Sequence, residues 1–406
     1  MRVLLIGNYP NDGQESMRRF ADLLELHLPN YGIGTEQLCP APVVGRLLRA
    51  STGLGKWLGY IDKFLLFPRR LRKRIERFKS NLLVHICDHS NAVYTRALAG
   101  IPHLVTCHDL LAIRSALGEF PECRVRASGR AYQQWILRSL NAARSVACIS
   151  TATRRDLVRL STLEPGQSSL IYNGLNYSYS PLPKVVSVER LGDVLPTMDD
   201  GGFILHVGGN QWYKNRLGVI QIYSRLREKM PRPPQLVMVG KPFTAEMRRA
   251  ISANQLEGCV MELNRVSNED LQALYSTAQL LLFPSLEEGF GWPIIEAQAC
   301  GCPVVLADRE PMNEVGGRAA AYFKLQRAEP GPLSEHSADG AVTALMEILL
   351  ESLHEREGRI ERGLRNAAGF STIRMVEEYI ALYREIISGG RERIQAPQLS
   401  ASIATL

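Results

Sequence analysis

Ten short apolar runs, distributed along most of the 406 residues, constrain the fold more than any other feature of this sequence. Segments with helical character separate the runs. Near-continuous apolar strands that alternate with helices are typical of parallel sheets covered on both faces, so we predict an α/β fold. The runs form two series: Val3–Gly7, Leu82–Cys87, His103–Cys107, Ser145–Ile149 and Ser169–Tyr172, then Phe203–Val207, Gln235–Val239, Val260–Leu263, Gln279–Phe283 and Pro303–Ala307.

Two such series predict two doubly wound, Rossmann-like domains whose strand-to-helix loops open toward a shared cleft. We place an N-terminal domain at 1–176, a linker at 177–202 and a second domain at 203–375. The linker is inferred from its mixture of Pro, Ser, Gly and acidic residues without periodicity. A helix at 376–389, able to return to the N-terminal domain, and a flexible tail at 390–406 complete the expected organisation.

Composition excludes several classes of protein. An apolar fraction of 45% argues against global disorder, and the sequence has no run of 18 apolar residues that would span a membrane. The first residues fit a strand better than a signal peptide. The eight cysteines show no metal-binding spacing, so we expect free thiols, no metal site and a cytoplasmic location.

The stretch from Phe283 to Val305, FPSLEEGFGWPIIEAQACGCPVV, joins a strand end to a glycine turn and a helix start. Pro293 suits the first turn of a helix because its missing N–H costs no hydrogen bond there. Gly289 and Gly291 allow the backbone to approach a ligand, and free N–H groups at the helix start suit an anion such as a diphosphate. The glycines alone favour a plain turn with a solvated glutamate pair and a surface glutamate on the helix.

The whole string resembles the retaining glycosyltransferases of the family 4 type, whose hallmark is two glutamates separated by seven residues. Glu288 and Glu296 have this spacing, with GFGWPII between them. The resemblance implies that Glu288 contacts hydroxyls of the donor sugar near the reacting carbon and that Glu296 binds the ribose. It also implies that the backbone of Gly289, Phe290 and Gly291 holds the sugar and the phosphates.

A second block, FILHVGGNQWYKNR at 203–216, runs from a strand through Gly208 and Gly209 to Lys214. By itself it fits a solvated surface lysine. In the family, a lysine at this place binds the donor diphosphate. Cleavage of a sugar–phosphate bond requires such a cation, because negative charge accumulates on the departing diphosphate.

The chain departs from the family pattern beside this lysine. Many relatives carry an arginine where GNQ stands at 209–211, so Arg216 or Arg265 is a candidate for the second cation. The stretch LNRVSNEDL at 263–271 resembles the family segment whose backbone meets the nucleotide base. Arg265 and Val266 are therefore candidate donor-binding residues.

The N-terminal half has fewer landmarks, as expected of a domain that binds a variable acceptor. The sequence TCHD at 106–109 ends a strand, and relatives have a histidine here that faces the donor sugar. His108 is therefore a candidate catalytic residue, although a lone histidine is more often structural. The loop at 7–17 follows the first strand, where relatives carry a glycine-rich loop over the diphosphate, and Gly13 is its nearest equivalent.

The resemblance implies the two-domain GT-B arrangement and a retaining hexosyl transfer from a GDP-, UDP- or ADP-sugar to a hydroxyl acceptor, free or lipid-linked. It places this transfer in cell-surface polysaccharide or glycolipid assembly. No metal cofactor is expected, because side chains and helix N-termini neutralise the diphosphate. Two alternatives stay open: a sugar-nucleotide epimerase of the same fold, which forms product from donor alone, and a non-catalytic sugar-nucleotide-binding protein.

Residues 44–80 carry a net charge of +9, against +7 for the whole chain. Within RRLRKRIERFK, Leu71, Ile75 and Phe78 recur at helical spacing among basic residues, and aromatic residues precede them. We expect this segment to seat the protein on the anionic inner face of the cell membrane. The alternative is a solvated helix whose apolar stripe packs on the N-terminal domain. The segment lacks the motif of a known nucleic-acid reader, so we expect no nucleic-acid partner.

Overall fold

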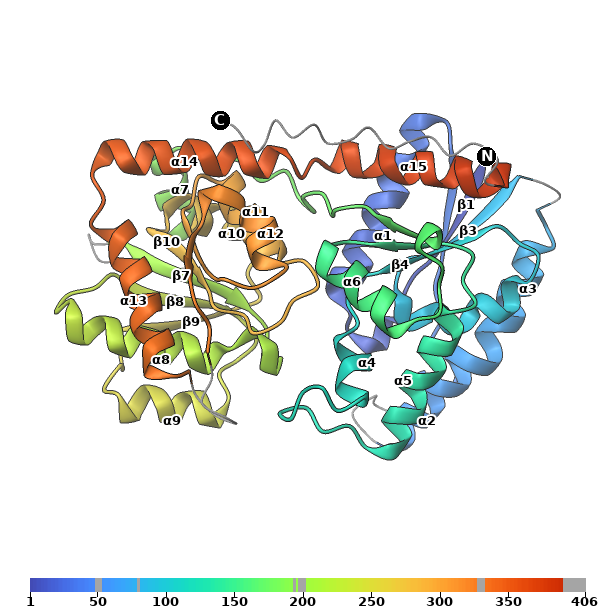
Figure 1. The fold of residues 1–406 in the computed structure, drawn as a ribbon, viewed down its shortest axis with the longest axis horizontal. Helices are drawn as coiled ribbons and strands as arrows, with labels where there is room; N and C mark the ends of the chain where they lie inside the picture. Colours follow the sequence, from blue (N-terminus) through green and yellow to red (C-terminus); the bar gives the residue numbers. More distant parts are fainter. Residues whose placement is uncertain (48–52, 79–80, 193–194, 196–201, 327–332, 390–406) are drawn as a thin grey trace.

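We describe the protein from a computed structural model, which covers residues 1–47, 53–78, 81–192, 195, 202–326 and 333–389. Two parallel six-stranded sheets, each flanked by helices, build the two halves of the molecule (Figure 1). The predicted α/β class with two doubly wound domains is confirmed. The tail predicted at 390–406 lies outside the described residues.

The first sheet has the strand order β2-β1-β3-β4-β5-β6. Its central strands are buried along their whole length because helices cover both faces, which explains their near-continuous apolar sequence. The strands are β1 (Arg2–Ile6), β2 (Gly34–Leu38), β3 (Leu82–Ile86), β4 (His103–Cys107), β5 (Val146–Cys148) and β6 (Ser168–Leu170). The helices are α1 (Glu15–His27), α2 (Gly53–Ile61), α3 (Phe67–Ile75), α4 (Leu111–Ala116), α5 (Ala127–Leu140) and α6 (Thr151–Leu160).

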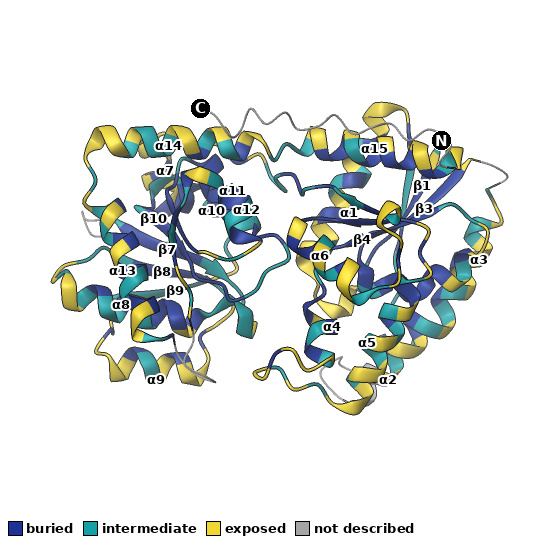
Figure 2. Cartoon of the chain, viewed as in Figure 1, coloured by how far each residue is buried: buried dark blue, intermediate teal, exposed yellow. Residues whose placement is uncertain are grey.

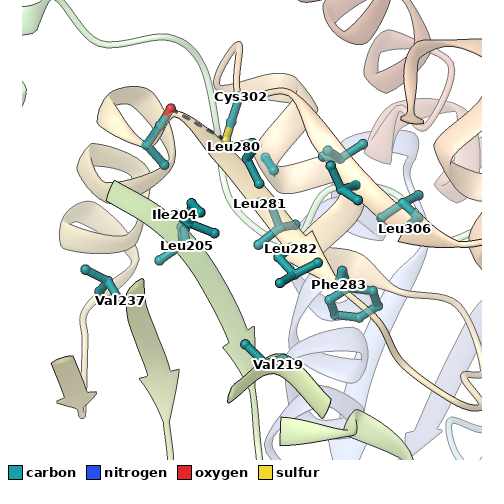
Figure 3. Packing of buried hydrophobic residues seen from close by; sticks show 14 of the residues in the cluster. Ile204, Leu205, Val219, Val237, Leu280, Leu281, Leu282, Phe283, Cys302 and Leu306 are labelled. Carbon is teal, nitrogen blue, oxygen red and sulfur yellow. Dashed lines mark hydrogen bonds between the residues drawn. The ribbon is translucent and has the colours of Figure 1, made fainter. Parts of the chain in front are cut away.

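The second sheet has the strand order β12-β11-β10-β7-β8-β9, and its central strands pack into one apolar core (Figure 3). The strands are β7 (Phe203–Gly208), β8 (Gln235–Gly240), β9 (Val260–Asn264), β10 (Leu280–Phe283), β11 (Val304–Ala307) and β12 (Ala321–Phe323). The helices in this half of the sequence are α7 (Lys184–Leu191), α8 (Arg216–Lys229), α9 (Ala245–Ala253), α10 (Asn268–Thr277), α11 (Trp292–Ala299), α12 (Met312–Gly316), α13 (Glu335–Leu349), α14 (Leu353–Ala368) and α15 (Thr372–Ser388), the last of which packs on the first domain.

The chain crosses between the two halves twice. The first crossing follows β6, and the second joins α14 on the second domain to α15 on the first (Figure 1). The crossings touch, since Thr372 Oγ1 donates a hydrogen bond of 2.6 Å to the carbonyl of Leu175. A Cβ on Gly174 would lie 2.4 Å from the Cα of Thr372, so only glycine permits this approach.

Helix α15 is part of the N-terminal core. Its buried face, dark blue in Figure 2, packs in one apolar cluster with residues of β1 and α1. A chain of buried polar groups reinforces the contact: His85 lies 2.7 Å from the Tyr383 hydroxyl and 2.7 Å from Thr106 Oγ1, which lies 3.0 Å from the Tyr379 hydroxyl. Burial lowers the pKa of His85 to about 3, so the ring is neutral in this network.

Two strands and one helix differ from the sequence-based expectation. β2 and β12 were not predicted, because β2 is a polar edge strand with the sequence GTEQL and β12 (AYF) directly follows the small-residue stretch GGRAA and forms no separate apolar run. The segment expected as a linker at 177–202 contains α7, whose Arg190 forms an ion pair of 2.9 Å with Asp270 of α10. Part of that segment is therefore packed structure of the second domain.

The apolar stripe of the basic segment packs on the N-terminal domain. Leu71 is fully buried in the core cluster, and Ile75 and Phe78 pack against it. These side chains are thus not available to a lipid surface. The stripe packs on the N-terminal domain, as the alternative in the sequence analysis stated. Outside the stripe, Trp57 and Leu65 remain 68% and 51% exposed.

We predict that the contact of α15 with the first domain is a main source of stability. Tyr379→Ala removes a fully buried ring and the hydroxyl that meets Thr106, and should lower the free energy of unfolding by about 3–5 kcal/mol. Ile373→Ala, in the same helix but 58% exposed, should change it by no more than about 0.5 kcal/mol. Denaturant unfolding measures both, and equal effects would contradict a core role for α15.

Candidate functional site

The site lies where the strand order of the second sheet reverses. β7 is followed by β8 and β9 on one side, whereas β10 pairs with β7 on the other. The loops after β7 and β10 therefore diverge at the carboxyl edge of the sheet, the usual place of ligand binding in open α/β folds. Lys214 comes from the first loop and Glu288 from the second.

Lys214 and Glu288 form an ion pair between these two loops. Lys214 Nζ donates to Glu288 Oε1 at 2.7 Å and to Oε2 at 2.9 Å. The two side chains are only 17% and 6% exposed, so the attraction acts in a medium of lower permittivity than water. An ammonium group has three N–H donors, so one remains for a further ligand. The two predicted residues are thus brought together.

Gly289 joins this loop to the first domain. A Cβ on Gly289 would lie 2.1 Å from the carbonyl oxygen of His108, which no side chain permits. The Thr153 hydroxyl lies at the same junction, 3.3 Å from the His108 oxygen and 3.4 Å from the Gly289 oxygen. The backbone beside Glu288 is therefore in contact with the end of β4.

His108 is buried at the carboxyl edge of the first sheet. Its Nε2 lies 2.8 Å from the carbonyl oxygen of Cys87, so Nε2 carries the proton and donates. Among the described residues Nδ1 has no partner, and in this tautomer it is an acceptor. Burial lowers the pKa of His108, which keeps the ring neutral. The Phe20 ring meets it edge-on, with the ring centroids 4.9 Å apart.

Glu296 is buried in the first turns of α11. One carboxylate oxygen accepts a hydrogen bond of 2.9 Å from Asn176 Nδ2, and the other accepts one of 3.0 Å from the Tyr275 hydroxyl. Burial raises the pKa of Glu296, and these two donors oppose the shift. Each oxygen keeps a further lone pair for a ligand hydroxyl.

The helix start expected near Trp292 and Pro293 is present. Gly291 precedes α11 with a φ of 100°, a left-handed conformation that favours glycine, and Pro293 lies in the first turn. Phe290 is buried in the core beneath the turn. The free N–H groups of this turn lie in the same loop as Glu288, as an anion site requires.

The remaining candidates follow strands of the two sheets. Gly208 ends β7, and Gly209 follows it. Arg265 is exposed and has a φ of 59°, whereas Val266 packs partly against the core. Gly13, with a φ of 64°, ends a short 3-10 turn after β1.

Arg216, the other candidate second cation, is buried at the start of α8. It donates to the side chain of Asn210 and to the carbonyl of Lys241, at 2.7 Å. Its hydrogen bonds are thus to loops of the second domain and not to Glu288.

Sequence reasoning missed three residues that organise the site. Asn176 and Tyr275 hold Glu296, and Arg114 of the first domain reaches Glu287, with Nη1 3.0 Å from Oε2. Glu287 also pairs with Arg309 at 2.7 Å. The position of Glu287 next to the candidate catalytic Glu288 was a signal for this residue. No sequence motif marks its partners, Arg114 and Arg309. Among the described residues, no cluster of His, Cys, Asp or Glu is arranged to hold a metal ion.

Comparisons with known proteins agree with this architecture. The model of the glycosyl transferases group 1 matches residues 189–324, and that of Glycosyltransferase Family 4 matches residues 36–179. This chain belongs to glycosyltransferase family 4. The predicted family is confirmed, and the protein is a glycosyltransferase of the GT-B type.

Among curated relatives, the chain is 26% identical over 344 residues to the O-antigen chain mannosyltransferase B of Escherichia coli, covering 79% of this chain and 83% of the relative. It is 25% identical to the O-antigen chain mannosyltransferase RfbU of Salmonella typhimurium over 54% of this chain and 55% of the relative. Anabaena HepE, solved with UDP and glucose, shares the fold with a TM-score of 0.69 at 15% identity, over 95% of this chain and 99% of that protein.

We predict that turnover depends on the buried ion pair. Lys214→Ala should lower kcat about a hundredfold or more, because the variant lacks a cation in a water-poor site. Glu288→Gln should impair transfer while the protein stays folded. Lys229→Ala, at the other end of α8, is the matched control and should leave kcat unchanged. Near-normal turnover of either site variant, measured on purified protein, would remove that residue from the assignment.

Proposed function

We propose that this glycosyltransferase moves a hexosyl group from a nucleotide sugar to a hydroxyl acceptor with retention of configuration and without a metal. The observation that carries the proposal is the buried Lys214–Glu288 pair at the edge where the two domains meet. The third N–H of Lys214 stabilises the negative charge of the departing diphosphate. The N–H groups of the Gly289–Gly291 turn at the start of α11 share that task.

The other side chains of the cleft position the donor. Glu288 accepts hydrogen bonds from sugar hydroxyls, and the free Nδ1 of neutral His108 accepts another. Glu296, held by Asn176 and Tyr275, binds the ribose hydroxyls. Arg265 and Val266 line the place of the base, and the loop of Gly13 covers the diphosphate. In a front-face displacement the leaving diphosphate accepts the proton of the acceptor hydroxyl, so no dedicated general base is required.

Relatives indicate the class of substrate. HepE was solved with UDP and glucose, which supports a nucleotide-sugar donor, and the two named bacterial relatives are O-antigen mannosyltransferases. We therefore propose mannose as the first donor sugar to test and a cell-surface polysaccharide chain, free or lipid-linked, as the acceptor.

A donor screen tests this function. Mannosyl and glucosyl nucleotides of UDP, GDP and ADP are incubated with oligosaccharide acceptors, and NMR reads the anomeric configuration of the product. We expect transfer with retention that EDTA does not abolish. Inversion, or loss of activity that Mg²⁺ or Mn²⁺ restores, would refute the mechanism. Product formed from donor alone would favour an epimerase, and binding without reaction a non-catalytic protein.

We also propose that residues 44–80 bind an anionic membrane surface from the cytoplasmic side. In the structure, Trp57, Ile61 and Leu65 are exposed at intervals of one helical turn. Basic residues follow this apolar surface in the sequence. A groove of about 750 Å³ beside β2 is lined by six of them, Arg69, Arg70, Arg72, Lys73, Arg74 and Arg77. Exposed apolar groups next to cations suit the interface between acyl chains and headgroups.

Not all of the basic residues are available for this role. Lys63 pairs with Asp12 at 2.9 Å, and Arg74 with Glu36. Arg49 and Lys79 lie outside the described residues. In the part of the chain that the structure describes, no helix has the length and apolar character needed to cross a bilayer.

Liposome flotation tests the membrane proposal. Binding should grow with the fraction of anionic lipid and weaken with salt, because the attraction is screened. Arg70→Glu with Lys73→Glu should abolish it, whereas Arg232→Glu with Arg249→Glu in the second domain changes the net charge equally and should have little effect. An unbound protein on anionic vesicles at low salt would refute the proposal.

A further inference from the structure

A cavity of about 880 Å³ lies on the face of the second sheet covered by α8 and α9. Neither Lys214 nor Glu288 lines it. It shares with their site the turn that carries Trp212 and Asn215, and its wall includes Leu286, two residues before Glu288. The loop after α4 of the first domain contributes Glu122 and reaches toward this face (Figure 1). The cavity is thus a neighbour of the donor site and distinct from it.

The cavity is lined by a buried cation with unused donors. Arg216 is 4% exposed, and its Nη1 donates hydrogen bonds to the side chain of Asn210 and the carbonyl of Lys241. Its Nε and Nη2 have no hydrogen-bond partner among the described residues. The Phe243 ring lies under the guanidinium, with the centroid 5.2 Å away.

Two N–H donors of a guanidinium are costly to bury without hydrogen-bond partners, so Nε and Nη2 call for an anionic ligand. Burial lowers the pKa of Arg216, and the charge of Glu262 opposes that shift without an ion pair to Arg216 among the described residues. Arg216 is also the first residue of a fourteen-residue helix, whose N-terminus favours negative charge. A carboxylate suits the planar, two-pronged geometry of Nε and Nη2.

The rest of the lining argues against a polyanion such as a diphosphate. It includes the carboxylates of Glu122, Glu228, Glu246 and Glu335, which repel further negative charge and accept hydrogen bonds from hydroxyls. Gln211 and Asn254 add amides, and the half-buried Trp212 offers an aromatic face. Arg225 also lines the cavity, but it is paired with Glu228 and Asp339. Arg216 is thus the lining arginine whose donors lack partners among the described residues. Hydroxyl acceptors, amides and one aromatic ring around Arg216 match a sugar with one acidic group.

We propose that this cavity is an acceptor subsite for a saccharide that bears one carboxylate, with Arg216 as the counter-charge. The assignment rests on the proposed glycosyl transfer, because it specifies the acceptor. The carboxylate accepts two hydrogen bonds from Nε and Nη2, and the sugar hydroxyls donate to the lining glutamates. Arg216 is a specificity residue of the acceptor side and not part of the diphosphate site.

Two matched probes test the subsite: methyl glucuronoside and methyl glucoside, which differ in a carboxylate at C6. Ligand-observed NMR titration should show that the wild-type protein binds the glucuronoside about ten- to a hundredfold more tightly, as expected for hydrogen bonds to a charged group. Arg216→Gln should abolish this preference and leave the affinity for nucleoside diphosphates unchanged. Arg232→Gln, an exposed arginine of the same domain, should change neither.

A second variant tests the subsite even if Arg216→Gln does not fold. Ser224→Trp places a large side chain in the cavity and leaves Arg216 intact, so binding of both probes should fall while nucleotide binding persists. A wild-type protein without preference for the glucuronoside overturns the proposal. Loss of nucleotide binding in Arg216→Gln also overturns it, since Arg216 would then serve the donor site. Arg216-dependent glucuronoside binding without any glycosyl transfer would leave the subsite standing and refute the proposed function.

Discussion

The site depends on two opposite charges that are paired and largely shielded from water. The ammonium of Lys214 and the carboxylate of Glu288 both lose hydration at this depth, and the partner's charge offsets that loss together with the Tyr213 and Phe283 rings beside the ammonium. The pair requires the loops after β7 and β10 to be adjacent, and β10 reaches that position only because α10 carries the chain back across the sheet from β9. The strand order of the second sheet is thus what brings Lys214 and Glu288 together.

Sequence patterns predicted what depends on local periodicity. The ten apolar runs correspond to ten of the twelve strands in the part of the chain that the structure describes. β2 was not predicted because its sequence, GTEQL, is polar, and β12 because its three residues directly follow small residues and form no separate apolar run. α7 was not predicted, because it lies in a segment whose Pro, Ser and Gly content is typical of a linker.

The candidate site was predictable to the extent that chemistry resides in contiguous motifs. Glu288, Glu296 and Lys214 each stand in such a motif. Asn176 lay at the predicted boundary of the linker, and neither Tyr275 nor Arg114 stands in a motif that marks the site. Their importance comes from contacts 120, 21 and 173 residues distant in the chain, which only the folded structure creates.

The same contacts limit how the two domains can move. α15 belongs to the core of the first domain, and its buried polar chain through His85 and Thr106 makes detachment costly. The other contacts between the domains are smaller than the buried contact of α15. They include the contact of Gly289 with the His108 carbonyl and the ion pair of Arg114 with Glu287. We therefore expect that separating the domains would break these smaller contacts and the ion pair of Arg155 with Glu310, and would bend the chain at its two crossings, near 174–176 and 369–372. Since Asn176 lies at one crossing and holds Glu296, such bending also acts on the residue proposed to bind the ribose.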